Sequence, residues 1–303
     1  MANGLTVVLR RGDLARARAC AIVTSANDAL SGNANPNYWR FAQRVNADGR
    51  VRALGGPALA AACEALPLLP SDTAPRDIQR WESTAKRGVS ARVRCRVGAA
   101  VATPAFGPLL ETTRHVIHAV APDAEFGYEG HYQGAPGLRG DKRSAPPLVL
   151  LRSAFASALD VASSVGARRV AVASLGAGVK GWRPAISAGV ALDAVATMAG
   201  AAAPASSSLA VVEFVIGEKD DAAWVSWERV ARQLLGAPAG GDGVCEWELS
   251  PTDTPTDPDA SRLVGAACCL PLHQVDAFAY FAKSSEPRDG WAGKDWRPTE
   301  NGW

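Results

Sequence analysis

Residues 169–182 read RVAVASLGAGVKGW and join a short apolar run to a glycine-rich loop. After its first residue the run Arg169–Ser174 has no charge on either face, which is typical of a strand covered on both sides. The loop Leu175–Trp182 places three glycines directly before the helical pattern of Pro184–Met198. Successive small residues expose backbone N–H groups at the start of a helix, and such groups suit a diphosphate.

This loop also matches the GxGxxG pattern of dinucleotide-binding units at Gly176, Gly178 and Gly181. Those units normally use the first strand of their domain and place an acidic residue about 20 positions further on. Here the loop lies late in the chain, and Gly200–Pro204 contains no acid. A nicotinamide-dependent oxidoreductase therefore ranks below other functions of a nucleotide-binding loop.

Strands and helices alternate on both sides of this unit. Several of the strands are apolar on both faces, which favours an α/β fold: a three-layer α/β/α sandwich with a mixed, mostly parallel central sheet. The predicted strands are Leu5–Leu9, Ala21–Ser25, Ala99–Thr103, His115–Val120, Arg169–Ser174 and Leu209–Ile216, and the predicted helices are Pro57–Leu66, Leu148–Val165, Pro184–Met198 and Asp220–Leu235.

The domain is predicted to cover residues 1–236, with enlarged loops at 31–47, 67–92 and 124–147. Beyond Gly236 the periodicity stops, and Pro251–Pro258 repeats Pro, Thr and Asp. Residues 237–303 are predicted to form a Pro- and Trp-bearing C-terminal appendage, partly disordered or packed on the domain, with a short ordered piece at Leu263–Ala282.

Composition argues against several kinds of partner. A formal net charge of +2 over 303 residues gives no electrostatic reason for direct nucleic-acid binding. No apolar run reaches the roughly 20 residues of a membrane-spanning helix, so we expect no membrane association. The six cysteines lack CxxC spacing, which favours buried thiols in a reducing compartment and hence a cytoplasmic or nuclear protein.

Metal binding is not expected from the histidines or cysteines. His115 and His118 lie three residues apart on a predicted strand, where they point to opposite faces. The pair Cys268 and Cys269 has only His273 nearby, which does not complete a tetrahedral set. We therefore expect neither a metal nor a cofactor.

Four segments, in order along the chain, place polar or glycine residues at the ends of predicted strands. Ligands of open α/β sheets bind at the carboxyl ends of the strands, so these segments are expected to meet there. They are Arg11-Gly12-Asp13-Leu14; AIVTSAN at 21–27; NADGRV at 46–51 followed by GGPAL at 55–59; and a fourth group formed by Cys95–Gly98, Thr103-Pro104, Val116–His118 and Leu175–Trp182.

Together these segments resemble the macrodomain family over roughly residues 5–235. The first is similar to the family's GDI, the second to its AIVNAAN strand end, the third to its VDGAI…AGPEL, and the fourth to its CxxGxAxxT, VIH and ISTGVYGYP elements. The chain departs from these patterns at Thr24, Lys180 and Arg183, and it has Arg52 where family hydrolases often have a histidine.

The register of the third segment has two readings. A gapless alignment puts Asn37 near the position of the family's aspartate. We prefer Asp48, because the flanking Gly49 and the downstream Gly-Pro-x-Leu fit the family only in that register.

The resemblance implies a cleft for ADP-ribose or an ADP-ribosylated macromolecule. In it Asp13 would accept from the exocyclic amine of adenine, and Asn27 would bond to ribose hydroxyls. Asp48 would lie beside the distal ribose. The implied catalytic residues are Asn27 and Asp48, and the implied substrate-binding residues are Asp13, Leu14, Ala26, Gly176, Ala177, Gly178, Val179, Lys180, Gly181, Trp182 and Ile216.

Two functions follow from the resemblance. In the first, Asp48 orients or deprotonates a water, and the protein hydrolyses a bond at the distal ribose of a mono-ADP-ribosyl group, O-acetyl-ADP-ribose or ADP-ribose 1″-phosphate. In the second, the protein is a reader that binds ADP-ribose without turning it over.

Plain structural roles remain open for the same residues. Asp13 is suited to capping the following helix, Asn27 to forming a turn, and Asp48-Gly49 to forming a tight turn. The glycine-rich loop is equally suited to being a simple connection. Three aromatic residues in the enlarged first loop fit either a lid over the ligand or packing of that loop onto the core: Tyr38, Trp39 and Phe41.

Overall fold

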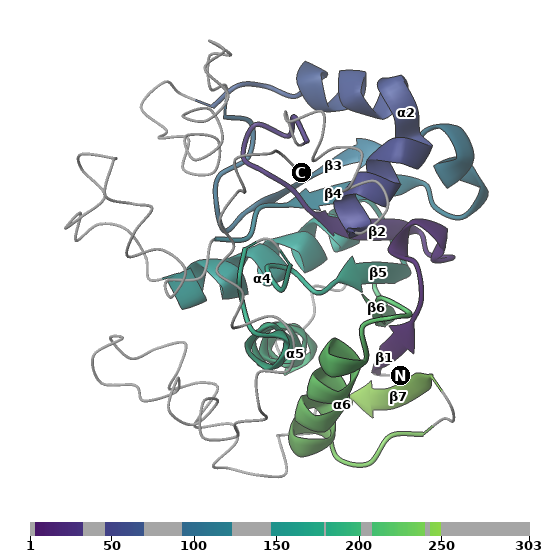
Figure 1. Cartoon of the computed structure of the whole chain (residues 1–303), viewed down its shortest axis with the longest axis vertical. Coiled ribbons are helices and arrows are strands. Elements are labelled where there is room, and N and C mark those ends of the chain that lie inside the picture. Colours follow the sequence, from purple (N-terminus) through teal and green to yellow (C-terminus); the bar gives the residue numbers. More distant parts are fainter. Residues whose placement is uncertain are drawn as a thin grey trace, which may run out of the picture.

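A seven-stranded sheet forms the centre of the molecule (Figure 1). The computed structural model describes residues 4–32, 46–69, 93–122, 147–178, 180–200, 208–239 and 243–249. The strand order is β3-β4-β2-β5-β6-β1-β7. The strands are β1 (Leu5–Arg11), β2 (Ala21–Ser25), β3 (Ala100–Pro104), β4 (His115–Ala119), β5 (Arg169–Ala173), β6 (Val211–Ile216) and β7 (Val244–Leu249).

The sheet is mixed and mostly parallel. Its five inner strands, β4, β2, β5, β6 and β1, run parallel to one another. The edge strands β3 and β7 each pair antiparallel with their neighbour. This arrangement confirms the expected sheet.

Helices cover both faces of the sheet, so the three-layer α/β/α sandwich is confirmed (Figure 1). Helices α4 (Pro147–Ser164), α5 (Pro184–Gly200) and α6 (Asp221–Leu235) pack in series on one face. Helix α2 (Ala47–Ala65) lies on the other face and contacts the 3₁₀ turns η1 (Leu14–Arg16) and η2 (Gly107–Glu111).

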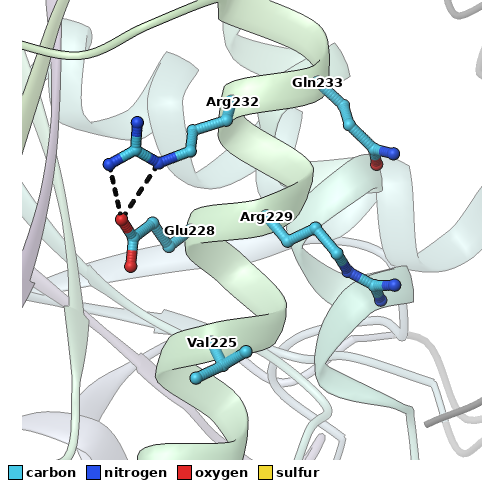
Figure 2. Close-up of a pocket in the computed structure, with 5 residues that line it drawn as sticks. All are labelled: Val225, Glu228, Arg229, Arg232 and Gln233. Carbon is cyan, nitrogen blue, oxygen red and sulfur yellow. Dashed lines mark hydrogen bonds and ion pairs between the residues drawn. The ribbon is translucent and has the colours of Figure 1, made fainter.

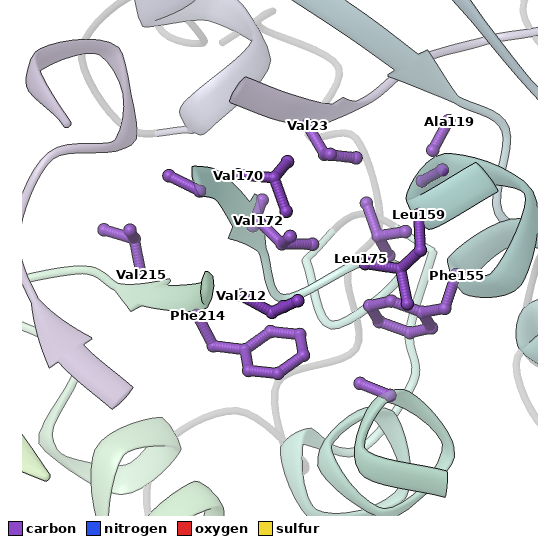
Figure 3. Close-up of a cluster of buried hydrophobic side chains, with 14 of the residues drawn as sticks. Val23, Ala119, Phe155, Leu159, Val170, Val172, Leu175, Val212, Phe214 and Val215 are labelled. Carbon is purple, nitrogen blue, oxygen red and sulfur yellow. The ribbon is translucent and has the colours of Figure 1, made fainter. Parts of the chain in front are cut away.

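The main hydrophobic core covers both faces of the sheet, and a large part of it packs against helices α4, α5 and α6 (Figure 3). Phe214 of β6 meets Phe155 of α4 edge-on, with ring centroids 6.4 Å apart, and Trp227 of α6 at 4.8 Å. All three side chains are almost fully buried. Burying one such side chain stabilises the fold by about 1.5–3 kcal/mol, so this aromatic group fixes how the helices sit on the strands.

Strand β7 was not predicted, and it lies in the segment assigned to the C-terminal appendage. Its side chains alternate, with Cys245, Trp247 and Leu249 buried against the core. Trp247 Nε1 donates to the Gly236 carbonyl at 2.9 Å. The sheet therefore continues past the expected boundary at Gly236, to Leu249. Residues 250–303, with the predicted piece Leu263–Ala282, lie outside the described residues.

Helix α2 is longer than the predicted Pro57–Leu66. It begins at Ala47 and contains one non-helical residue, Gly56, with φ 60° and ψ −159°. Pro57 follows at the first turn of the second helical piece, a position that proline favours. The predicted loops 31–47, 67–92 and 124–147 fall mostly outside the described residues, as do Tyr38, Trp39 and Phe41.

The described part of the chain contains no candidate for a membrane-spanning helix. None of its helices is both long and apolar enough to span a bilayer.

Candidate functional site

Four adjacent parallel strands bring predicted site residues to one edge of the sheet. Asp13 follows β1, Ile216 ends β6, the loop from Gly176 follows β5, and Asn27 follows β2. Gly12 N donates to the Ile216 carbonyl at 2.8 Å, which ties the first two strand ends together. With about 4.8 Å between neighbouring strands, the three intervals from β1 to β2 make a row about 14 Å long.

Asp13 lies at one end of this row and is held on both carboxylate oxygens. Oδ1 accepts from Ala15 N at 3.0 Å, so Asp13 does cap the following 3₁₀ turn. Oδ2 accepts from Arg50 of α2, at 2.8 Å from Nη2 and 3.2 Å from Nε. Sequence reasoning missed Arg50, since its only signal is its place within the NADGRV segment.

Asn27 organises the turn that follows β2. Its Oδ1 accepts from Ser31 N at 3.0 Å, and its Nδ2 donates to the Gly32 carbonyl at 2.5 Å. The Leu30 N–H also donates to the Asn27 carbonyl at 3.1 Å. The turn-forming role considered for Asn27 is therefore present, and it fixes the side chain at the end of the strand.

Asp48 lies in the first turn of α2, where the positive end of the helix dipole favours a carboxylate. The helix is capped by Asn46, whose side chain accepts from Gly49 N at 2.7 Å. The tight turn considered for Asp48-Gly49 is therefore wrong. Asp48 Oδ2 accepts from Arg52 Nε at 3.0 Å. Its Oδ1 is buried and has no hydrogen-bond partner among the described residues.

Arg52 is buried, with its side chain 6% exposed. Besides the bond to Asp48, its Nη2 donates to the Leu30 carbonyl at 3.1 Å. Arg52 therefore joins the start of α2 to the turn after β2.

A second buried polar group lies near Arg52. His118 Nε2 of β4 is 3.0 Å from Thr103 Oγ1 and 3.5 Å from Cys63 Sγ of α2. Burial, with a smaller effect of the Arg52 charge, lowers the pKa of His118 to about 3. Burial also raises the pKa of the Cys63 thiol. At neutral pH the imidazole and the thiol are therefore both uncharged, which suits packing rather than catalysis.

The other cysteines in the described part of the chain are also free thiols. Cys95 and Cys245 are buried, and Cys20 is partly exposed. Burial, with a smaller contribution from Asp28, raises the pKa of Cys95 to about 12. No three His, Cys, Asp or Glu residues gather there in a way that would hold a metal ion.

The glycine-rich loop curls around the buried side chain of Trp182. Trp182 N donates to the Gly176 carbonyl at 3.0 Å, and its Nε1 donates to the Pro122 carbonyl at 2.8 Å. Gly176 and Gly181 have φ angles of 78° and 76°, which glycine adopts freely. Gly178 is exposed at the tip. The loop is therefore pinned at its base and presents its tip at the sheet edge.

The remaining predicted residues divide into three groups. Leu14, Ala26 and Ile216 are buried at the strand ends. Ala177 and Lys180 are partly exposed in the loop. Val179 lies outside the described residues.

A separate open hollow lies on the outer face of α6, and no predicted site residue lines it. Figure 2 shows that its lining side chains all project from this one helix. They are Val225, Glu228, Arg229, Arg232 and Gln233.

Comparisons with known proteins agree on one family. The chain matches the Macro domain family over residues 71–191. A macro domain-containing protein of Streptomyces nogalater is 30% identical over 192 residues, which are 63% of this chain and 78% of that protein.

Two solved macrodomain structures are similar to this chain at low identity. A glycine-to-valine variant of the Oceanobacillus iheyensis macrodomain with ADPR is 18% identical, with a TM-score of 0.49, over 77% of this chain and 95% of that chain. A Trypanosoma brucei macrodomain in complex with ADP-ribose is 17% identical, with a TM-score of 0.48, over 74% of this chain and 68% of that chain.

Proposed function

Because this chain belongs to the macrodomain family, we propose that the site at its sheet edge binds ADP-ribose, free or attached to a macromolecule. The observation that supports this most is the order of groups along four adjacent strand ends. An acceptor, a glycine-rich loop and a carboxamide follow one another at Asp13, Gly176–Trp182 and Asn27. An elongated nucleotide with a base, a diphosphate and a second ribose needs such a row.

Each part of the row has chemistry suited to one part of the ligand. Asp13 can accept from an amine of the base, and Arg50 beside it adds a donor. The exposed tip of the loop at Gly178 suits the diphosphate. Asn27, at the far end of the row from Asp13, offers a carboxamide to the distal ribose, and Asp48 at the start of α2 offers a carboxylate.

We further propose that the site hydrolyses a bond at the distal ribose. Asp48 Oδ1 is the acceptor that takes a proton from the attacking water. The water oxygen bonds to the anomeric carbon, the bond from that carbon to the leaving group breaks, and the leaving group keeps the bonding electrons. A base placed in this way contributes about 10²–10⁴-fold in rate.

The chemistry of Arg52 limits the kind of leaving group that can depart. Its guanidinium bonds to Asp48 and to the Leu30 carbonyl, and because arginine is not deprotonated in proteins it supplies no proton to a departing group. A substituent that departs as a stable anion, such as phosphate or a carboxylate, needs no such proton. The substrates proposed are therefore ADP-ribose 1″-phosphate, an ADP-ribosylated acidic side chain, or O-acetyl-ADP-ribose in the isomer that carries its acetyl group on the anomeric oxygen.

Because Arg52 supplies no proton to a leaving group, one alternative is also favoured, a non-catalytic reader of ADP-ribose. With Arg52 as the side chain bonded to Asp48 among the described residues, the site binds ADP-ribose and does not release a basic or alkoxide leaving group. The alternative differs from hydrolysis only in turnover.

A panel of ADP-ribosyl substrates separates the two functions. Release of free ADP-ribose is measured for the wild type, for Asp48→Ala and for Asp160→Ala, a control at an exposed position on α4. A hydrolase loses turnover in Asp48→Ala while its Kd for ADP-ribose stays within about tenfold. The control keeps both. Absence of turnover on every substrate in the wild type, with ADP-ribose binding intact, identifies the reader.

A further inference from the structure

The turn after β2 and the start of α2 are joined through one buried side chain. Arg52 Nε donates to Asp48 Oδ2 at 3.0 Å, and its Nη2 donates to the Leu30 carbonyl at 3.1 Å. One guanidinium thus bonds to the carboxylate on the helix and to the main chain of the turn. A planar fork with fixed donor directions sets the spacing of two acceptors more firmly than a single point charge does.

Gly32 completes the connection to Asn27. A Cβ on Gly32 would lie 3.0 Å from Cδ and Nε of Arg52, so the main chain of the turn rests against the guanidinium group. The carbonyl of the same glycine accepts from Asn27 Nδ2 at 2.5 Å. The two residues expected at the distal ribose are therefore connected: Asn27 is hydrogen-bonded to Gly32, Gly32 packs against Arg52, and Arg52 is hydrogen-bonded to Asp48.

The pairing leaves the two oxygens of Asp48 in different states. Oδ2 accepts from Arg52, whereas Oδ1 is buried and has no hydrogen-bond partner in the part of the chain that the structure describes. Buried acceptors without a partner are rare in native proteins, because they lose their hydration without compensation. A hydroxyl group of a ligand at this end of the site would satisfy Oδ1.

We propose that Arg52 is a positioning residue, which holds Asp48 at a fixed distance from the Asn27 turn so that Oδ1 accepts a hydrogen bond from the distal ribose. This inference rests on the proposed binding of ADP-ribose and does not require turnover. A residue that only stabilises the fold would affect every ligand of the site in proportion to the folded fraction. A positioning residue affects the ligand that has a distal ribose and spares one that lacks it.

The experiment compares ADP-ribose with ADP by calorimetry and follows the ratio of the two Kd values. The variants are Arg52→Met, Arg52→Lys, Asp48→Ala and the double variant Arg52→Met with Asp48→Ala. Arg152→Met is the matched control, since it removes another arginine–aspartate pair, to Asp193, between α4 and α5 on the opposite face of the sheet.

The preference for ADP-ribose over ADP is expected to fall about tenfold in Arg52→Met and in Asp48→Ala, the loss typical of one hydrogen bond to a charged group. In the double variant the preference is expected to fall no further, because both changes remove the same contact. The preference is expected to fall in Arg52→Lys as well, since one ammonium group cannot reproduce the planar set of donors of the guanidinium. Arg152→Met keeps the wild-type ratio.

Two outcomes overturn the inference alone: a wild-type ratio in folded Arg52→Met or Arg52→Lys, or losses that add in the double variant. Should Arg52→Met not fold, Arg52→Lys decides. A wild-type protein that binds neither nucleotide overturns the proposed function, and this inference with it.

Discussion

Gly176 occupies the position in the loop after β5 where a side chain fits least. Its φ angle is 78°, and a Cβ there would lie 2.5 Å from Cδ1 of the buried Trp182. Gly178, two residues further on, has open space around it. The two glycines of one motif therefore have different physical reasons for being glycine.

Replacing Gly176 by Ala is expected to lower the free energy of unfolding by about 2 kcal/mol, from the left-handed backbone and the contact with Trp182. Gly178→Ala is expected to stay within about 0.5 kcal/mol of the wild type. Urea unfolding of both variants measures the difference. Equal losses would contradict this account of the loop.

His118 makes stability depend on pH. Its folded-state pKa of about 3 lies below its ordinary value of 6.5, so between these values the unfolded chain binds the extra proton. The free energy of unfolding therefore rises with pH across this range, by at most about 1.4 kcal/mol per pH unit, and the stabilisation is lost as pH falls toward 3. It is complete above pH 6.5.

The substitution His118→Gln is expected to reduce this slope, since glutamine can bond to Thr103 but does not titrate. Urea unfolding at several pH values between 4 and 7 provides the measurement. If both proteins showed the same slope, His118 would not be the group responsible.

Sequence reasoning at the residue scale was good for residues at strand ends and poor for their partners. Asp13, Asn27 and the loop glycines follow apolar runs, so their place at one edge could be predicted. Arg50 and Arg52 could not be assigned, because their role depends on which turn α2 packs against. That contact is made across the fold and has no local signal.

At the scale of elements, ion pairs around one buried glutamate connect three strands. Glu213 of β6 is 3% exposed and pairs with Arg169 of β5, at 2.5 Å, and with Arg10 of β1. Glu228 of α6 pairs with Arg232 of the same helix, at 2.7 Å, on the surface. The same substitution, glutamate to glutamine, can therefore be compared at a buried position and at a more exposed one.

Glu213→Gln is expected to cost about 1–3 kcal/mol, because it removes the charged partner of two arginines, which are 43% and 35% exposed and can be hydrated in part. Glu228→Gln is expected to change stability by about 0.5 kcal/mol or less. Thermal and urea unfolding of the pair would show the contrast. Comparable small losses would mean that the ion pairs around Glu213 are solvated in solution.

Elements with one clear pattern were the ones that could be predicted. Strand β2 and helix α4 combine a long apolar pattern with clear ends, and their observed bounds lie within one residue of the expected ones. The first half of α2 was missed because Gly55, Gly56 and Pro57 interrupt the helical pattern. The structure accommodates them by a break at Gly56 that joins two helical pieces.

At the scale of the molecule, β7 decides where the folded sheet ends. Its alternation VCEWEL lasts only six residues and follows a segment rich in Gly and Pro. The sequence pattern was therefore too short to separate it from the C-terminal appendage. Its pairing with β1 and the burial of Trp247 make it part of the sheet.

Two truncated chains test this boundary. Residues 1–249 keep β7 and its pairing with β1, so this chain is expected to melt at a higher temperature than residues 1–236. Residues 1–236 lose β7 and the burial of Trp247, which costs about 3–5 kcal/mol for a large aromatic side chain. Equal melting temperatures for the two fragments would show that β7 contributes little.

The most direct test of the account is a crystal structure of the wild-type chain grown with ADP-ribose. The account predicts the base beside Asp13 and Arg50, the diphosphate at the Gly176–Trp182 loop, and the distal ribose within hydrogen-bond distance of Asp48 Oδ1. ADP-ribose bound elsewhere, such as in the hollow on α6, or absent from the sheet edge at saturating concentration, would contradict it.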